Sequence, residues 1–454
     1  MAEGQRQTRR QHRRDPKPRD SRPYIADVRR AERTAAGRLG TSAAMVLLAL
    51  VVGFAIGFVV FLLMNLSGWL TKLLWEGVGE RLHIPAFPLI CCTIGGIVIG
   101  VWTKLSGNSI DSLETVMGQF KETGSYRLNN PPATAVSFLL PLAFGGSIGF
   151  EAGLTGIIAA GCCWVRDRLK VAGLRAAGIA DVTIAASLSA IFAAPLAGLV
   201  AGFESENDEA LQTELGNVDD YNLRREAKLV LYLAAALGSF GGIAACTRLF
   251  GGSGGFPRFE AIGAHGTELL WGLLALVAAW VLLLVFRGTE KAAEVLSHRL
   301  DAQPYGSVVL PVIAGVLLGA IALALPLVLF PGEEQSHELM ESWTSMSATV
   351  LLATGVLKAV VTPLCIELGW KGGDLFPCIF AGVATGYGLA ALTGADAMLM
   401  VTVTTTAFLA GVTRKPLLAL GILALCFPLR GILYMGLAAL AGSALPVPAA
   451  LAKE

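Results

Sequence analysis

Long apolar stretches alternate with shorter polar ones over most of this chain. The clearest apolar stretches run from Ala43 to Leu63, Leu269 to Phe286, Val308 to Phe330 and Leu417 to Leu440. A helix that spans the hydrocarbon core of a bilayer needs about 20 mostly apolar residues. The pattern therefore predicts an all-α membrane protein that crosses the bilayer several times.

Glycines and prolines interrupt these stretches repeatedly. Gly145-Gly146, Pro195, Gly372-Gly373, Pro377 and Pro416 all fall inside apolar runs or at their ends. Non-helical backbone at membrane depth is tolerated only where it is buried in protein or lines a cavity. We therefore expect many short, tilted and broken transmembrane helices, an arrangement typical of transporters.

The chain has two parts of similar outline, separated by the polar stretch from Glu204 to Lys228. Each part has a glycine-rich break followed by an apolar helix, at Phe144 to Gly156 and at Gly369 to Gly382. Each then reaches a Pro-Leu helix start, at Pro195 and at Pro416, where proline favours the first turn. This similarity predicts an inverted repeat with a binding site between the halves.

The charges and the apolar pattern together suggest four regions. Residues 1–40 are rich in arginine and have no apolar period, so we expect a basic, disordered N-terminal segment. Its charge places it in the cytoplasm by the positive-inside rule, rather than marking it as a nucleic-acid-binding tail. Residues 41–220 and 221–444 form the two halves of the membrane domain, and 445–454 a C-terminal tail.

Composition agrees with a membrane protein and gives no sign of a cofactor. The chain is 54% hydrophobic and 15% charged, whereas soluble domains are nearer a quarter charged. Its 8 cysteines lie in apolar segments without CxxC spacing or a nearby histidine, so no metal site is expected. No histidine adjoins a candidate nucleophile, which disfavours an enzyme and leaves a non-transporting scaffold as the alternative from another class.

Glu151 is the most informative single residue. It follows Gly149 and Phe150 at the start of an apolar run, where a lone carboxylate is costly unless it has a role. Exposed backbone N–H groups and the positive end of a helix favour an anion there. The carboxylate itself can fill that anion site, and protonation would then release it and admit a substrate anion. An ordinary N-terminal helix cap is the alternative.

Two further segments have the features of anion sites. Lys371 to Pro377 places two glycines before a helix start, which makes either an amide-lined anion site or a tight turn. Ser106 to Asp111 contains Asn108 and Ser109, whose side chains can donate hydrogen bonds to an anion or serve as an N-cap.

Taken together and in order, five segments resemble the motifs of the CLC family of chloride channels and chloride/proton antiporters. They are Gly107 to Asp111, Gly149 to Gly153, Ala193 to Gly198, Gly372 to Pro377 and Arg414 to Leu418. The resemblance extends from about Leu89 to Phe427. It implies the CLC-like inverted repeat and a homodimer with one anion pathway in each subunit.

The resemblance assigns roles residue by residue. Glu151 matches the gating glutamate, which also transfers protons. The anion-binding positions correspond to Asn108, Ser109, Gly149, Phe150, Gly373, Asp374, Leu375 and Phe376. Asn108 stands where the family usually has serine, and fluoride-exporting members also depart from serine there.

Two positions depart from the antiporter pattern. Ser205, flanked by Glu204 and Glu206, stands where antiporters often have an internal glutamate for proton relay. The family's central tyrosine has no secure match, and Tyr434 is the nearest candidate.

The expected function is transport of chloride or a related small anion, in exchange for protons or without coupling. A fluoride/proton antiporter is the alternative within the same class. A chain this short, without a transit peptide, suggests a multi-pass protein of a bacterial plasma membrane, and no nucleic-acid partner is expected.

Overall fold

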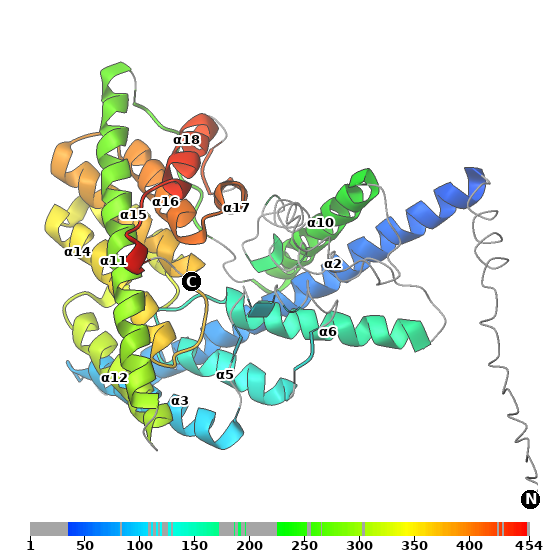
Figure 1. Cartoon of the computed structure of the whole chain (residues 1–454), viewed down its shortest axis with the longest axis horizontal. Helices are drawn as coiled ribbons and strands as arrows, with labels where there is room; N and C mark the ends of the chain where they lie inside the picture. The colour runs from blue at the N-terminus through cyan, green and yellow to red at the C-terminus, as the bar shows by residue number, and fades with distance from the viewer. Residues whose placement is uncertain are drawn as a thin grey trace, which may run out of the picture. The chain divides into compact units, whose positions relative to one another are not determined.

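The part of the chain that its computed structural model describes is mostly α-helical (Figure 1). The described residues are 35–81, 84–107, 110–111, 115–116, 119, 126–128, 130–171, 186, 189–191, 196, 225–251, 256–264, 266–301, 305–424, 426–428 and 431–451. Within them, six helices are long and apolar enough to cross a membrane.

Up to Phe250, the described residues form five α-helices. They are α2 (Ala35–Lys72), continued by the π-helix η1 (Leu73–Glu80), α3 (Phe87–Ser106), α5 (Pro131–Ala143), α6 (Glu151–Val171) and α10 (Arg225–Phe250). The apolar stretch that begins at Ala43 lies within α2, as its pattern predicted.

After α10, long helices alternate with short ones. In order they are η2 (Gly266–Leu270), α11 (Trp271–Asp301), α12 (Gly306–Ala322), η3 (Pro326–Val328), α13 (Glu333–Ser342), η4 (Trp343–Ser345), α14 (Ala348–Glu367), α15 (Leu375–Thr393), α16 (Ala397–Thr413), α17 (Pro416–Leu423), α18 (Ile432–Ser443) and η6 (Ala449–Leu451).

The broken helices expected from the glycines and prolines are present. The stretch from Leu417 to Leu440, apolar enough for one span, is divided between α17 and α18. The stretch from Val308 to Phe330 likewise ends its helix at Ala322. Hydropathy alone predicts these two stretches as continuous, and that expectation is wrong at both positions.

Small residues let the helix backbones approach closely. A Cβ atom at Gly96 of α3 would lie 2.3 Å from the Pro311 carbonyl oxygen of α12, and one at Gly315 of α12 would lie 2.2 Å from the Cys92 oxygen of α3. Gly53 of α2 meets the Ala235 carbonyl of α10 in the same way. Lipid tails give no hydrophobic drive for helices to associate, so close van der Waals packing of this kind holds them together.

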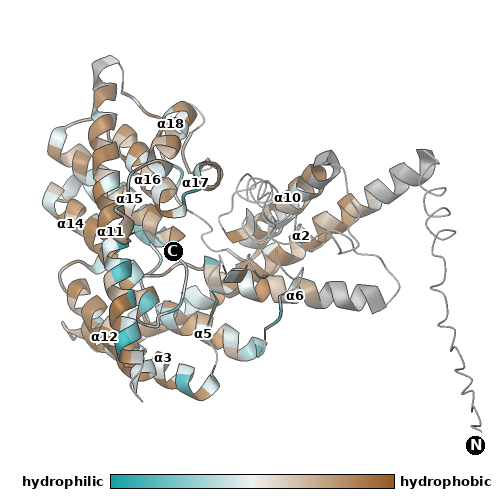
Figure 2. Ribbon diagram, in the orientation of Figure 1, coloured by the Kyte–Doolittle hydropathy of each residue, from teal (hydrophilic) through white to brown (hydrophobic). Residues whose placement is uncertain are grey.

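Large apolar side chains face outward along the membrane helices. Leu105 of α3, Leu273 of α11 and Leu437 of α18 are exposed, and hydrophobic residues colour much of α11 and α12 (Figure 2). On a water-soluble protein such surfaces would be unusual. In a bilayer they meet lipid.

The packing of α3 against α12 gives a stability prediction. Gly96→Ala puts a methyl group onto the Pro311 carbonyl, and overpacking of this kind costs about 1–3 kcal/mol. Thermal unfolding in detergent should show a lower midpoint for this variant. Gly436→Ala is the matched control, because nothing lies within 4 Å of its added Cβ. An unchanged midpoint for Gly96→Ala would contradict the close approach.

Candidate functional site

Two glycine loops, one from each half, pair with each other. The Gly149 N–H donates to the Gly373 carbonyl at 2.7 Å, and the Gly373 N–H donates back to Gly149 at 3.0 Å. This antiparallel bridge joins the α5–α6 loop to the α14–α15 loop. It sets the starts of α6 and α15 beside each other.

The first loop is held by a compact turn after α5. Gly145 has φ +88°, a conformation that a residue with a side chain rarely adopts. The Gly146 N–H returns to the Pro141 carbonyl at 2.8 Å, and the Trp75 indole donates to the Ala143 carbonyl at 3.0 Å. The carbonyls at the end of α5 therefore have partners although the helix is broken.

The second loop is built in a similar way. Gly369 has φ +99°. The Trp370 backbone N–H donates to the Cys365 carbonyl at 2.8 Å, and its indole donates to the Pro311 carbonyl at 2.8 Å. Two tryptophan indoles thus donate to main-chain carbonyls near the loops, Trp75 of η1 to the end of α5 and Trp370 of the second loop to α12.

Side chains also link the two loops. The Ser147 and Thr362 hydroxyls lie 3.1 Å apart and are buried. Gly372 packs on Ile148 so closely that a Cβ would lie 2.5 Å from its Cδ1. Both loops are therefore fixed at their centres as well as by the glycine bridge.

Glu151 points across this bridge toward the other half. It is the first residue of α6 and is 1% exposed. Its Oε1 accepts the Leu375 N–H at 2.5 Å, and the backbone N–H groups of Phe376 and of Glu151 itself also interact with the carboxylate. Within the described residues, Oε2 is buried without a hydrogen-bond partner.

The carboxylate lies directly over the bridging glycines. A Cβ at Gly149 would lie 2.0 Å from Oε2, and one at Gly373 would lie 2.0 Å from Cδ. No side chain fits at either glycine while Glu151 keeps this position. The backbone amides and the positive ends of two helices therefore surround a single negative group.

A second acid and an aromatic cluster border this position. Asp374, the N-cap residue of α15, is partly exposed and is a charged neighbour of Glu151. The Phe150 and Phe376 rings pack edge to face with their centroids 5.6 Å apart, and the Phe256 ring centroid lies 5.2 Å from that of Phe376. The rings shield one side of the site, whereas Asp374 adds negative charge to it.

A buried cation lies on α14, the helix that precedes the second loop. Lys358 is 0% exposed, and its ammonium donates to the carbonyls of Val328, Leu329 and Phe330 at 3.0, 3.1 and 2.5 Å. It also faces the Phe380 ring of α15 at 5.3 Å. Three carbonyl dipoles thus replace an ionised partner for this charge. The sequence signal was a lone lysine in an apolar run, which our sequence analysis did not use.

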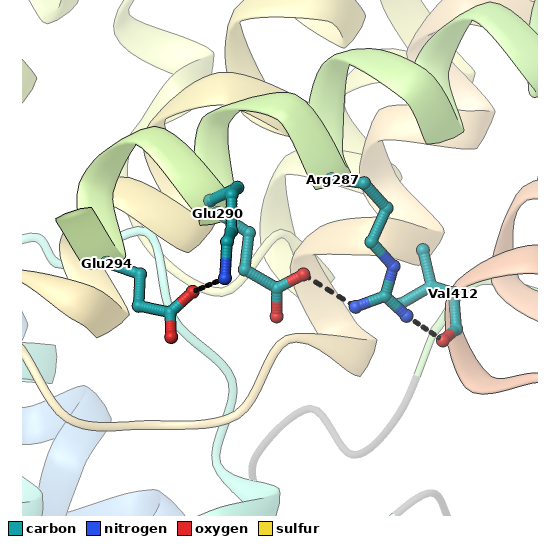
Figure 3. A network of polar contacts seen from close by, with 5 residues as sticks. Arg287, Glu290, Glu294 and Val412 are labelled. Carbon is teal, nitrogen blue, oxygen red and sulfur yellow. Dashed lines mark hydrogen bonds and ion pairs between the residues drawn. The ribbon is translucent and has the colours of Figure 1, made fainter. Parts of the chain in front are cut away.

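An ion pair on α11 lies near the end of α16. The Arg287 guanidinium donates to Glu290 at 2.6 Å and to the Val412 carbonyl at 2.6 Å (Figure 3). One turn further along, Lys291 pairs with Glu294 at 2.9 Å. None of these residues stands out in the sequence as a candidate site residue.

The structure brings together most of the sequence-predicted site. Gly149, Phe150, Glu151 and the stretch from Gly373 to Phe376 converge on one position. Asn108 and Ser109, and the relay candidates Glu204, Ser205 and Glu206, lie outside the described residues.

The tyrosine candidate does not join this group through any described contact. Tyr434 lies on α18 and is partly exposed. Tyr387 is fully buried on α15, about three turns beyond Leu375, and its ring centroid lies 5.0 Å from that of Trp343. Its hydroxyl has no partner among the described residues. No described contact joins this tyrosine to Glu151 either.

These features define a multi-pass helical membrane protein with an amide-lined position for an anion between two related halves. Comparison with known proteins places it in a family. The protein-family model for voltage gated chloride channels matches residues 95–446, which is most of the chain. The chain therefore belongs to the CLC family.

One curated relative and several solved structures are similar to the chain. It is 25% identical over 369 residues to the chloride channel protein CLC-e of Arabidopsis thaliana, in a match that covers 74% of this chain. The chain spans about half the length of that relative, since the match covers 48% of it.

The solved structures share the fold at low sequence identity. A CLC-type fluoride/proton antiporter aligns with TM-score 0.67 and 17% identity, covering 88% of this chain and 94% of its own. A eukaryotic CLC transporter gives 0.65 and 17%, covering 88% and 72%. A slow cyanobacterial Cl⁻/H⁺ antiporter gives 0.65 and 16%, covering 87% and 93%. The predicted CLC-like fold is confirmed.

Lys358 gives a second stability prediction. Lys358→Met removes the donor from three buried carbonyls, and each buried group left unsatisfied costs about 1–3 kcal/mol. We expect thermal unfolding in detergent at a clearly lower temperature than for wild type. Lys291→Met, at a half-exposed position, should unfold at the wild-type temperature. Equal midpoints for the two variants would show that the carbonyl contacts do not stabilise the fold.

Proposed function

We propose that the protein exchanges a small anion for protons across the membrane, with Glu151 as both gate and proton acceptor. One observation carries the proposal: the Glu151 carboxylate is buried over the paired glycines and accepts the Leu375 N–H. A carboxylate held by amides at two helix starts stands where a substrate anion would be stabilised by the same groups.

Protonation would open this position. Neutral Glu151 loses the attraction of the helix termini and of the Leu375 amide, so its side chain can leave and an anion can replace it. The departing side chain takes one proton with it. The Glu151 carboxylate and the substrate anion thus occupy the same position in turn. This alternation links anion movement in one direction to proton movement in the other.

Chloride is the leading substrate, and fluoride is the second candidate. Asn108, which replaces the family's usual serine, favours fluoride, and the similarity to a fluoride/proton antiporter agrees with it. An uncoupled anion channel is the remaining possibility within the class. We assign anion contact to Asn108, Ser109, Gly149, Phe150 and the residues from Gly373 to Phe376.

The orientation and assembly complete the proposal. The arginine-rich N-terminus supports a cytoplasmic start. We further propose a homodimer in a bacterial plasma membrane, with a separate pathway in each subunit.

The direct test is anion efflux from proteoliposomes with simultaneous recording of external pH, in chloride and then in fluoride. Wild type should take up protons as the anion leaves. Glu151→Gln cannot ionise, so it should carry anion without proton uptake. Anion efflux from wild type without any pH change would reject coupling and leave a channel. No efflux of either anion would reject the transport assignment of this site.

Asp374 should weaken anion binding, because its charge lies close to Glu151. Two unit charges 4 Å apart interact by about 1 kcal/mol even in bulk water, which corresponds to roughly a fivefold change in affinity. Asp374→Asn should therefore lower the half-saturating anion concentration by about that factor. Asp396→Asn, at the N-cap of α16, is the control and should leave it unchanged. A higher half-saturating concentration in Asp374→Asn would show that the carboxylate assists the anion.

A further inference from the structure

Glu151 is buried, so a proton needs a carrier between it and the solution. Among the described residues, the Arg287–Glu290 ion pair on α11 shares a neighbouring side chain with Glu151. This neighbour is the Cys378 thiol of α15. Its charged neighbours are Asp374 and Glu151 together with Arg287 and Glu290.

The pair lies where α11 leaves the apolar part of its length. With 31 residues, α11 is about 46 Å long, whereas the hydrocarbon core is about 30 Å thick. The helix is apolar from Trp271 to Phe286, and its charged residues begin at Arg287. The Arg287 side chain is 8% exposed and that of Glu290 is 20% exposed. Glu290 is therefore accessible, although its partner is buried.

The packing of α15 on α16 brings this pair to the level of the site. Gly382 meets Thr405 and Gly386 meets Val401, so the two helices run antiparallel and are in close contact (Figure 1). By this register the first turn of α15, which holds Glu151 through Leu375, lies beside the last turn of α16. That last turn contains Val412, whose carbonyl binds Arg287 (Figure 3).

Buried hydroxyls line this helix pair. Thr404, Thr405 and Thr406 of α16 are buried, and none of their hydroxyls has a partner among the described residues. Thr405 faces Gly382, one turn beyond Cys378 on α15. Buried hydroxyls in proteins are usually paired with protein or water. These groups can bind water within the packing of α15 on α16, about two helical turns from Leu375 and Val412.

The end of α11 and the end of α3 lie on the same side of the membrane. The Lys104 ammonium at the end of α3 lies 5.1 Å over the Tyr305 ring, which follows α11. With the N-terminus in the cytoplasm, α2 crosses outward and α3 returns. Glu290 then faces the cytoplasm.

We propose that Glu290 is the carboxylate that accepts protons from the cytoplasm and passes them to Glu151. This inference rests on the proposed exchange of anions for protons. Glu290 takes a proton from water and becomes neutral, and its release from Arg287 frees the proton to move through water to the Glu151 carboxylate. Glu290 then returns to its ionised form against Arg287. Arg287, fixed by the Val412 carbonyl, is a positioning residue.

Other charged groups near the Arg287–Glu290 pair influence proton transfer through Glu290. Lys291 and Glu294 lie beyond it on α11, and Arg414 follows α16 close enough to interact with Arg287. On α15, the Cys378 thiol is close enough to be influenced by the charges of both members of the pair. Because Lys291 and Glu294 pair with each other, Glu294→Gln is the matched control for Glu290→Gln.

The test measures anion efflux and proton uptake together in proteoliposomes of the full chain. Glu290→Gln should lower proton uptake per anion at least tenfold while anion efflux stays within threefold of wild type. Glu294→Gln should keep the wild-type ratio. Glu290→His restores a proton acceptor with an ordinary pKa of about 6.5, so its coupling should recover at cytoplasmic pH 6 and fall at pH 8.

Three results would contradict the role of Glu290 or the exchange on which it rests. A wild-type proton ratio in Glu290→Gln overturns the assignment of Glu290 while Glu151→Gln still tests the proposed function. If Glu290→Gln does not fold, the His variant decides: coupling independent of cytoplasmic pH overturns the assignment. Absence of proton uptake by wild type itself would reject the proposed exchange, and the role of Glu290 with it.

Discussion

The reciprocal hydrogen bonds between Gly149 and Gly373 are the contact on which the site depends. They join loops from the two halves of the chain and set the starts of α6 and α15 beside each other. Because both residues lack a side chain, the Glu151 carboxylate can lie directly over the bridge and reach the Leu375 amide. A larger residue at either glycine would separate the loops from the carboxylate and remove the position for an anion.

Around this bridge, interrupted helices are possible because each interruption has its own hydrogen-bond donors. The Trp75 indole donates to the carbonyl where α5 ends, the Trp370 indole joins the second loop to α12, and Lys358 satisfies three carbonyls from the end of η3 to Phe330. In lipid these groups would otherwise lack partners at a cost of several kcal/mol each. The donors come from elements distant in sequence, so the breaks and the packing around them stabilise each other.

The sequence predicted the parts of this structure that follow from local chemistry. A carboxylate after glycines at an apolar helix start indicated Glu151, and paired glycines indicated the second loop. It did not predict the break between α17 and α18, because apolar composition does not indicate where a helix ends and the chain turns. Nor did it predict the contacts of Lys358 or the bond from Arg287 to Val412, whose acceptors are main-chain carbonyls rather than complementary side chains. Such partners leave no residue pattern to read.

The buried lysine also has a consequence for the order in which the chain enters the membrane. A charged residue at the centre of a helix costs about 2.5–3.5 kcal/mol on translocon-insertion scales. The carbonyls that bind Lys358 lie 28 to 30 residues earlier, so they are synthesised before it. Helix α14 should therefore partition into lipid together with the segment that ends at Phe330, as one biogenesis unit rather than as an independent span.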